Sequence, residues 1–173
     1  MTIRLCPYDP RWTAAFADEA DAIRRAYGAT PIQLHHIGST AIPGIVSKPI
    51  IDILGEVPNL SAAEAKAAAL AGLGYESMGA YGLNDRRYFR KTDASGARTH
   101  HLHLYVNGSA HVTRHIAFRD YLITHSDAAD AYSTLKAQLA QGGGAQYQDG
   151  KAPFVRRVEA VAVEWASTRT IMS

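Results

Sequence analysis

The pattern of apolar and polar residues predicts a helix, two strands and an irregular loop in the first third of the chain. An apolar stripe at helical spacing follows Asp9-Pro10, a pair typical of helix starts, and consists of Trp12, Phe16, Ile23 and Tyr27. Residues 32–37 and 49–57 are rich in Ile, Leu and Val, which predicts strands. Residues 38–48 between them contain Gly and Pro and predict a loop.

The remaining chain predicts short helices around a hairpin. Ser61 and Glu64 form a capping box before an alanine-rich helix that ends near Gly72 or Gly74. The strand-like segments are 75–79 and the hairpin arms 86–91 and 98–106. Three further helices are expected, from Ser109 or Thr113 to about Thr124, from Ser126 to the run Gly142-Gly143-Gly144, and from about Pro153 to Ser167. This order predicts a single α+β domain over residues 1–173, with a mixed sheet.

Composition narrows the class of protein without naming a function. The chain has 173 residues, of which 47% are apolar, and a net charge of +2. No apolar run approaches the roughly 20 residues of a membrane-spanning helix, and we see no secretion signal, so we expect no membrane partner. Cys6 is the single cysteine, which fits a reducing cytoplasm. Lys and Arg are spread along the chain, which argues against a dedicated nucleic-acid binder.

The loop after the first strand has features of an anion-binding turn. Gly38 lets backbone N–H groups approach an anion, and the hydroxyl groups of Ser39 and Thr40 add donors. Asp52 then interrupts an otherwise apolar strand, where an unpaired charge would be costly. A bound cation or hydrogen-bond donors would satisfy it, but so would a tight turn with Asp52 paired to Lys48 or an arginine.

Histidine is unusually frequent, with eight in the chain. On a strand, His101 and His103 project to one face, while their leucine neighbours project to the other. Near a carboxylate such a pair suits zinc, manganese, iron or nickel better than magnesium. It could equally hold a substrate phosphate, or be hydrogen-bonded in a polar cleft. The other histidines of this half are expected at structural, surface or cap positions, namely His100, His111, His115 and His125.

The run from His36 to Ile53 resembles the signature of the GrpB family, and the resemblance continues over nearly the whole chain. Its further motifs are Tyr8-Asp9-Pro10, Gly74-Tyr75, Arg87-Tyr88-Phe89, His101-Leu102-His103, Phe118-Arg119-Asp120-Tyr121-Leu122, Leu135-Lys136 and Tyr147 with Lys151. The family is similar to the nucleotidyltransferase superfamily, which implies a nucleotidyltransferase-like fold with a mixed sheet flanked by helices. It also occurs as a domain appended to dephospho-coenzyme A kinase, with a proposed role in folding that enzyme.

The resemblance implies a site for a nucleotide or another phosphorylated small molecule with a divalent metal. Magnesium or manganese would be usual, and zinc or iron are alternatives. The implied catalytic and metal-binding residues are Asp52, His101 and His103, expected within about 8 Å of each other in one cleft. The implied phosphate- or substrate-binding residues are His36, Gly38, Ser39, Thr40, Lys48, Arg87, Arg119, Lys136 and Lys151.

At one position the sequence departs from the superfamily pattern, and this argues against the standard two-metal mechanism. Leu54 stands where a second acid is expected, and Glu56 lies one side-chain repeat further along the strand. Three functions therefore stay open. They are a nucleotidyltransferase-like enzyme, an enzyme with one metal held by two histidines and an aspartate, and a non-catalytic module that binds a nucleotide or assists a protein partner.

Overall fold

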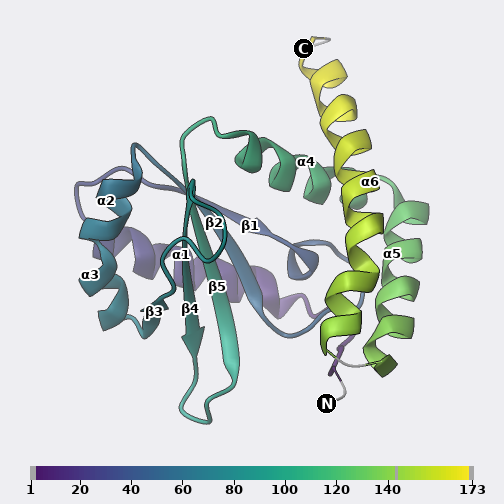
Figure 1. The fold of residues 1–173 in the computed structure, drawn as a ribbon, viewed down its shortest axis with the longest axis horizontal. Helices are drawn as coiled ribbons and strands as arrows, with labels where there is room; N and C mark the ends of the chain where they lie inside the picture. Colours follow the sequence, from purple (N-terminus) through teal and green to yellow (C-terminus); the bar gives the residue numbers. More distant parts are fainter. Residues whose placement is uncertain (1–2, 143, 172–173) are drawn as a thin grey trace.

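A five-stranded mixed sheet forms the centre of the computed structural model, which describes residues 3–142 and 144–171 (Figure 1). The strand order is β1-β2-β5-β4-β3. The strands are β1 (Gln33–Ile37), β2 (Ile51–Val57), β3 (Tyr75–Ser77), β4 (Arg86–Thr92) and β5 (Arg98–Val106). β2 and β5 are parallel, and the other neighbouring pairs are antiparallel. The parallel pair is possible because two helices, β3 and β4 separate β2 from β5 along the chain.

Helices cover both faces of the sheet (Figure 1). One face, with Ile53, Phe89 and Leu102, packs on α1, α2 and α3. On the other face, Leu54 and Tyr105 pack against α4, and α5 and α6 join α4 around a second apolar cluster. The helices are α1 (Arg11–Tyr27), α2 (Leu60–Ala65), α3 (Ala67–Gly72), α4 (Ala110–Thr124), α5 (Ser126–Leu139) and α6 (Gly144–Ile171), with short 3₁₀ turns η1 (Ser39–Ala41) and η2 (Ala140–Gly142). The expected α+β architecture with a mixed sheet is confirmed.

Most elements predicted from the sequence are present close to their expected bounds. The two arms of the predicted hairpin pair as β4 and β5, and the turn between them contains Asp93, whose carboxylate accepts from the N–H of Ser95 at 2.9 Å. Ser109 caps α4 by accepting from the N–H of His111. Asp9 accepts from the N–H of Arg11, the first residue of α1, at 2.9 Å. These positions were predictable because each depends on short-range hydrogen bonds.

Two helix starts were predicted wrongly. The capping box of Ser61 and Glu64 does not form; Asn59 caps α2 instead, accepting from the N–H of Ala62 at 2.8 Å. The last helix begins at Gly144 rather than near Pro153, which lies inside α6. Tertiary packing outweighs the local preference there, because the first turns of α6 bury the ring of Tyr147, which is 2% exposed. Of the predicted glycine run, Gly142 ends η2 and Gly144 begins α6, while Gly143 lies outside the described residues.

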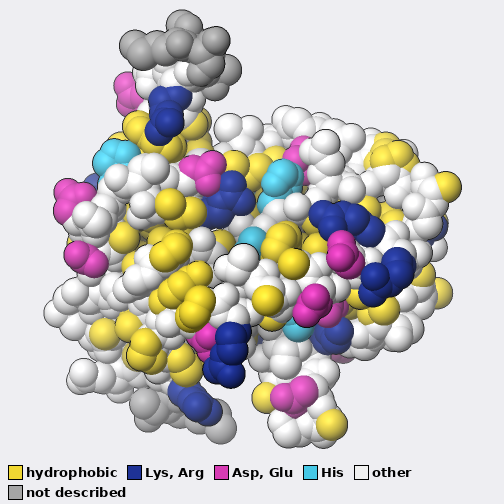
Figure 2. Space-filling model, turned by 180° about the vertical axis from the view of Figure 1, so that it is seen from behind, with side chains coloured by type: hydrophobic (Ala, Val, Ile, Leu, Met, Phe, Trp, Pro, Cys, Tyr) yellow, Lys and Arg dark blue, Asp and Glu magenta, His cyan; other side chains and the backbone are white. Residues whose placement is uncertain are grey.

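The hydropathy of the helices and the charges on the surface bear on how the protein meets its surroundings. None of the helices within the described residues combines the length and the apolar character needed to cross a bilayer. On the face seen in Figure 2, Lys and Arg side chains lie among Asp and Glu side chains. Charges of both signs are therefore mixed on this face.

Candidate functional site

The loop after β1 brings backbone into close contact with β2 at Gly38. Gly38 has a φ of +70°, in the left-handed region that favours glycine. A Cβ atom at this position would lie 2.6 Å from Oδ2 of Asp52. Glycine is therefore required here for the backbone conformation and for the space, and it leaves the Asp52 carboxylate directly beside the loop.

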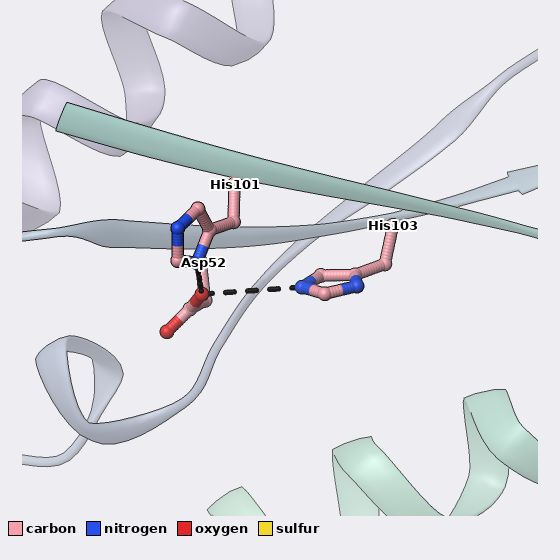
Figure 3. A group of neighbouring side chains, drawn as sticks. All are labelled: Asp52, His101 and His103. Atoms are coloured by element: carbon pink, nitrogen blue, oxygen red, sulfur yellow. Dashed lines mark hydrogen bonds and ion pairs between the residues drawn. The ribbon is translucent and has the colours of Figure 1, made fainter. Parts of the chain in front are cut away.

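Asp52, His101 and His103 come together on the face of the sheet that α4 partly covers. Asp52 on β2 is in register with His101 on β5, and Leu54 is in register with His103. The Nδ1 atom of His101 lies 2.9 Å from Oδ1 of Asp52, and Nε2 of His103 lies 4.0 Å from the same oxygen (Figure 3). One ligand atom from each residue lies within 4.8 Å of the other two. The expected convergence of these side chains is confirmed.

The environment favours the ionised form of Asp52. Burial by itself would raise the pKa of Asp52, but hydrogen bonding and charge from His101 and His103 act in the opposite direction and hold the pKa well below its ordinary value. The outer ring atoms, Nε2 of His101 and Nδ1 of His103, are buried and have no hydrogen-bond partner among the described residues. Buried polar atoms normally have a partner, but these two nitrogens lie on the far side of each ring from Asp52, so an ion held between the three residues would not be their partner.

The donor set fits one transition-metal ion better than magnesium. Two imidazoles and a carboxylate suit manganese, iron or zinc, whereas magnesium prefers oxygen ligands. Ligand atoms that share such an ion lie within about 4 Å of each other, which is close to the spread of 4.8 Å in this cluster. Asp52, His101 and His103 are therefore the residues that would hold the ion.

The acids of a two-metal site are not assembled around Asp52. Leu54 is fully buried and packs with Ile37, Tyr105 and Val112. Glu56 lies further along β2, where its carboxylate contacts Nε2 of His35 at 2.9 Å. Within the described residues, the neighbouring strand β5 contributes histidines where the superfamily pattern has a third acid. The arrangement thus favours a single ion.

A cavity of about 290 Å³ opens beside this cluster and is lined by cations from three segments. Lys48 precedes β2, Arg98 begins β5, and Lys151 lies on α6. The ammonium groups of Lys48 and Lys151 lie 4.8 and 5.1 Å from the centre of the Tyr147 ring. Burial is the main cause that lowers the pKa of each lysine, and Asp52 partly opposes it. Within the described part of the chain neither lysine forms an ion pair, so both are available to an anionic ligand.

Lys136 has a different position from Lys48 and Lys151, because it lies beneath the loop rather than in the cavity. Its side chain is 1% exposed, and Nζ donates to Oγ of Ser39 at 2.8 Å and to the carbonyl of Val46. Nζ also lies 4.5 Å from the centre of the Tyr132 ring. Burial, with a smaller effect of Lys151, lowers the pKa of Lys136 to about 7. Lys136 therefore holds both ends of the loop in place and presents Ser39 to the cavity.

This buried lysine predicts a rise in stability with pH. The folded pKa of about 7 lies below the ordinary value of 10.5, so between these values the unfolded chain binds more protons than the folded one. The cost of burying the charge is fully present below pH 7 and is relieved as the pH rises through that window. Between about pH 7 and pH 9 the free energy of unfolding should rise by roughly 2 kcal/mol more in the wild type than in Lys136→Met. Urea unfolding at several pH values tests this, and parallel curves would refute it.

His36, Thr40 and Arg119, which the sequence analysis placed among the phosphate-binding residues, do not line the cavity beside Asp52. His36 points to the α1 face of the sheet, where its ring stacks on Phe16 at 4.9 Å, and burial lowers its pKa to about 4. Its Nε2 contacts Oγ1 of the buried Thr40 at 2.9 Å. Arg119 donates to the His36 carbonyl at 3.0 Å and pairs with Asp120. All three stabilise the loop from outside the cavity.

Arg87, another of the expected phosphate-binding residues, also does not line the cavity. It is in register with Leu104, so it projects to the face opposite Asp52, and its Nε donates to Glu64 of α2 at 2.6 Å. Alternation along β4 assigns the site face to its neighbour Tyr88, whose ring lies 5.0 Å from that of His103. Arg87 therefore links β4 to α2 on the face opposite Asp52.

Two residues at the site were missed. Arg98 was part of a predicted strand, but nothing in its spacing connected it with Asp52. His115 was expected at the surface or in a cap; instead its ring lies 6.3 Å from that of His103, and burial lowers its pKa to about 3. The spacing of His111 and His115, one turn apart on α4 beside Val112, was the signal that could have found it.

Comparisons with known proteins identify relatives over nearly the whole chain. The family model described as GrpB protein matches residues 2–160. The UPF0157 protein YqkA of Bacillus subtilis is 36% identical over 170 residues, which cover 96% of this chain and 49% of YqkA. A dephospho-CoA kinase of Mycobacterium tuberculosis is 28% identical over 189 residues, which cover 94% of this chain and 46% of the kinase. The chain thus spans about half the length of these relatives.

Solved structures agree in fold. The crystal structure of the conserved protein GrpB from Enterococcus faecalis superposes with a TM-score of 0.88 and 35% identity, over 94% of this chain and 99% of that one. Cid1 in complex with the UTP analog UMPNPP matches with a TM-score of 0.54 and 10% identity, over 77% of this chain and 43% of Cid1. At that identity the likeness shows a shared fold alone, which is nucleotidyltransferase-like. On the match over residues 2–160 and these relatives, the chain belongs to the GrpB family.

Proposed function

We propose that this protein binds the phosphate groups of a nucleotide beside one divalent metal ion and transfers the nucleotidyl group to an acceptor. The observation that carries the proposal is the cavity that the Asp52, His101 and His103 cluster lines together with Lys48 and Lys151. Metal-ligating and cationic groups in one cavity suit a ligand that combines phosphate oxygens with a metal ion. The fold that this chain shares with Cid1 supports the same reaction class by analogy.

In this proposal the chain acts through positioning and charge, as is usual in phosphoryl transfer. Lys48, Arg98 and Lys151 bind phosphate oxygens, and the hydroxyl of Ser39, held by Lys136, adds a donor at the loop. Asp52 remains ionised and carries the negative charge that a divalent cation requires. The bound ion would supply a Lewis acid that polarises a phosphoryl oxygen.

A non-catalytic module is the second candidate, and Leu54 is the observation that favours it. The acid absent at this position would be needed for the two-metal mechanism, and its space is filled by core packing. Relatives that include dephospho-CoA kinases suggest that such a module works next to a kinase domain or assists its folding. The single cysteine fits a reducing compartment, and a cytoplasmic location is part of both proposals.

Binding and turnover can be measured separately. Titration calorimetry with ATP and with tripolyphosphate, in manganese and after chelation, should show binding that strengthens with the metal. Release of pyrophosphate from ATP, with water as the default acceptor, then reports on transfer. Metal-dependent binding without pyrophosphate release would favour the module. If neither phosphate compound bound, the proposed function would be wrong.

One cation that lines the cavity and one on the opposite side of the sheet provide a matched pair of substitutions. Lys151→Met should weaken binding of tripolyphosphate by roughly 10- to 100-fold, because a hydrogen bond to a charged group is worth about 1.5–3 kcal/mol. Arg87→Met removes a cation from the opposite face, where it pairs with Glu64, and should leave the affinity unchanged. Calorimetry of both variants against the same tripolyphosphate stock makes the comparison. Equal losses in the two would mean that overall charge, not the cavity, binds the anion.

A further inference from the structure

Tyr81 combines an exposed aromatic ring with an unfavourable backbone conformation. It lies in the loop between β3 and β4, and 61% of its surface is exposed. Among the described residues, Tyr81 is the non-glycine residue with a positive φ, at 45°. The left-handed region is disfavoured for a bulky side chain, and such strain clusters at functional positions. Folding alone would be served better by glycine or asparagine there.

The Tyr81 ring begins a row of rings that leads to the candidate metal ligands. Its centre lies 5.1 Å from that of Tyr88, with an angle of 37° between the planes. The Tyr88 ring in turn lies 5.0 Å from His103 and 5.6 Å from His101. These separations are typical of interacting aromatic pairs. The row therefore connects the surface to the cluster on the β4 side, whereas Lys48 and Lys151 approach it from the loop and α6.

Arg86 fixes the outer end of this row. Its guanidinium lies 5.3 Å from the centre of the Tyr88 ring, and Nη2 donates to the carbonyl of Tyr81 at 2.7 Å. The same atom donates to the carbonyl of Ala80 at 3.4 Å. The backbone of Tyr81 is thus held while much of its ring faces solvent, which is the arrangement of a preorganised stacking surface.

We propose that Tyr81 is a stacking platform at the exposed end of this row of rings and binds a planar heteroaromatic ring, such as a nucleobase. This inference rests on the proposed function, because the ring belongs either to the bound nucleotide or to the acceptor. Stacking on an aromatic side chain tolerates any base, since every base has a π face. The platform would add affinity for the ring without contacting the phosphate groups.

Two substitutions separate the ring from the backbone. Tyr81→Phe keeps the ring, whereas Tyr81→Asn removes it and places a residue that tolerates the left-handed region. Calorimetry in manganese then compares ATP with tripolyphosphate, which lacks a ring. A further arm titrates adenosine into protein saturated with tripolyphosphate, which represents the ring of a separate acceptor. Thermal unfolding of both variants without ligand reports on any structural role.

Tyr81→Asn should weaken the binding of a ring-bearing probe by roughly 5- to 100-fold and leave the affinity for tripolyphosphate unchanged. Tyr81→Phe should bind both kinds of probe with nearly the affinity of the wild type. If Tyr81→Asn loses affinity for ATP, the ring that stacks on Tyr81 belongs to the nucleotide. If it loses affinity for adenosine alone, that ring belongs to the acceptor. The melting temperature of Tyr81→Asn should not fall.

Three results would overturn the platform. The first is that the wild type and Tyr81→Asn bind ATP and adenosine with equal affinity. The second is that Tyr81→Asn loses as much affinity for tripolyphosphate as for ATP. The third is that the wild type binds ATP no more tightly than tripolyphosphate and does not bind adenosine. Only the failure of tripolyphosphate and ATP to bind the wild type at all would also refute the proposed function.

Discussion

An Asp52→Asn variant is expected to lose divalent-metal binding, and with it any metal-dependent turnover, while keeping its fold. The substitution preserves the shape of the side chain and removes the charge. His101 and His103 remain, but the negative charge in the cluster is that of Asp52. Loss of a metal carboxylate usually removes several kcal/mol of transition-state stabilisation, which corresponds to on the order of a thousandfold in rate.

Metal binding by this variant can be tested before a substrate is known. At a manganese concentration 100 times the dissociation constant, the native state gains about 2.7 kcal/mol. For a chain of this size that raises the melting temperature by roughly 5–10 °C. Asp52→Asn should show no such rise. Asp21→Asn is the matched control, because Asp21 lies exposed on α1 and pairs with Arg24. A wild-type response to manganese in Asp52→Asn would exclude Asp52 as a ligand.

Gly38→Ala is expected to damage both stability and the site, although it adds a single methyl group. The new Cβ would lie 2.6 Å from Oδ2 and 3.1 Å from Cβ of Asp52, so the loop or the carboxylate must move. The φ of +70° adds the left-handed strain of an alanine, about 1 kcal/mol. We expect a loss of roughly 2–4 kcal/mol in the free energy of unfolding, together with weaker binding of manganese. Urea unfolding and a manganese titration measure the two effects.

The same loop supplies a control that separates strain from collision. Gly44 has a φ of +86°, but a Cβ there would meet no atom within 4 Å. Gly44→Ala should therefore cost only the backbone strain, about 1 kcal/mol. Adding Asp52→Ala to Gly38→Ala should reduce the penalty of Gly38→Ala, since Oδ2, the atom that would lie 2.6 Å away, is removed, although Cβ at 3.1 Å remains. A double-mutant cycle with a coupling below about 0.5 kcal/mol would show that contact with Asp52 is not the cause.

The local pattern of the sequence determined most of the elements and the strand face that His101 and His103 share. Alternation with period two marked the strands and placed His101 and His103 on one face. An acid inside an apolar strand marked Asp52, and the turn residues marked the loop at Gly38. These inferences held because each depends on residues a few positions apart. The start of α6 differed, since burial of Tyr147 outweighs the preference of Pro153 for a first turn.

Only the tertiary structure decided which residues share the site. The parallel register of β2 and β5 pairs Asp52 with His101 across 49 positions of sequence. The antiparallel register of β4 with β5 places Arg87 opposite Leu104 and therefore on the other face of the sheet. Lys136 and His115 reach the loop and the cluster because α4, α5 and α6 pack together on that side of the sheet. A periodic pattern shows which residues share a face of one element, but the face that meets another element depends on packing across the whole chain.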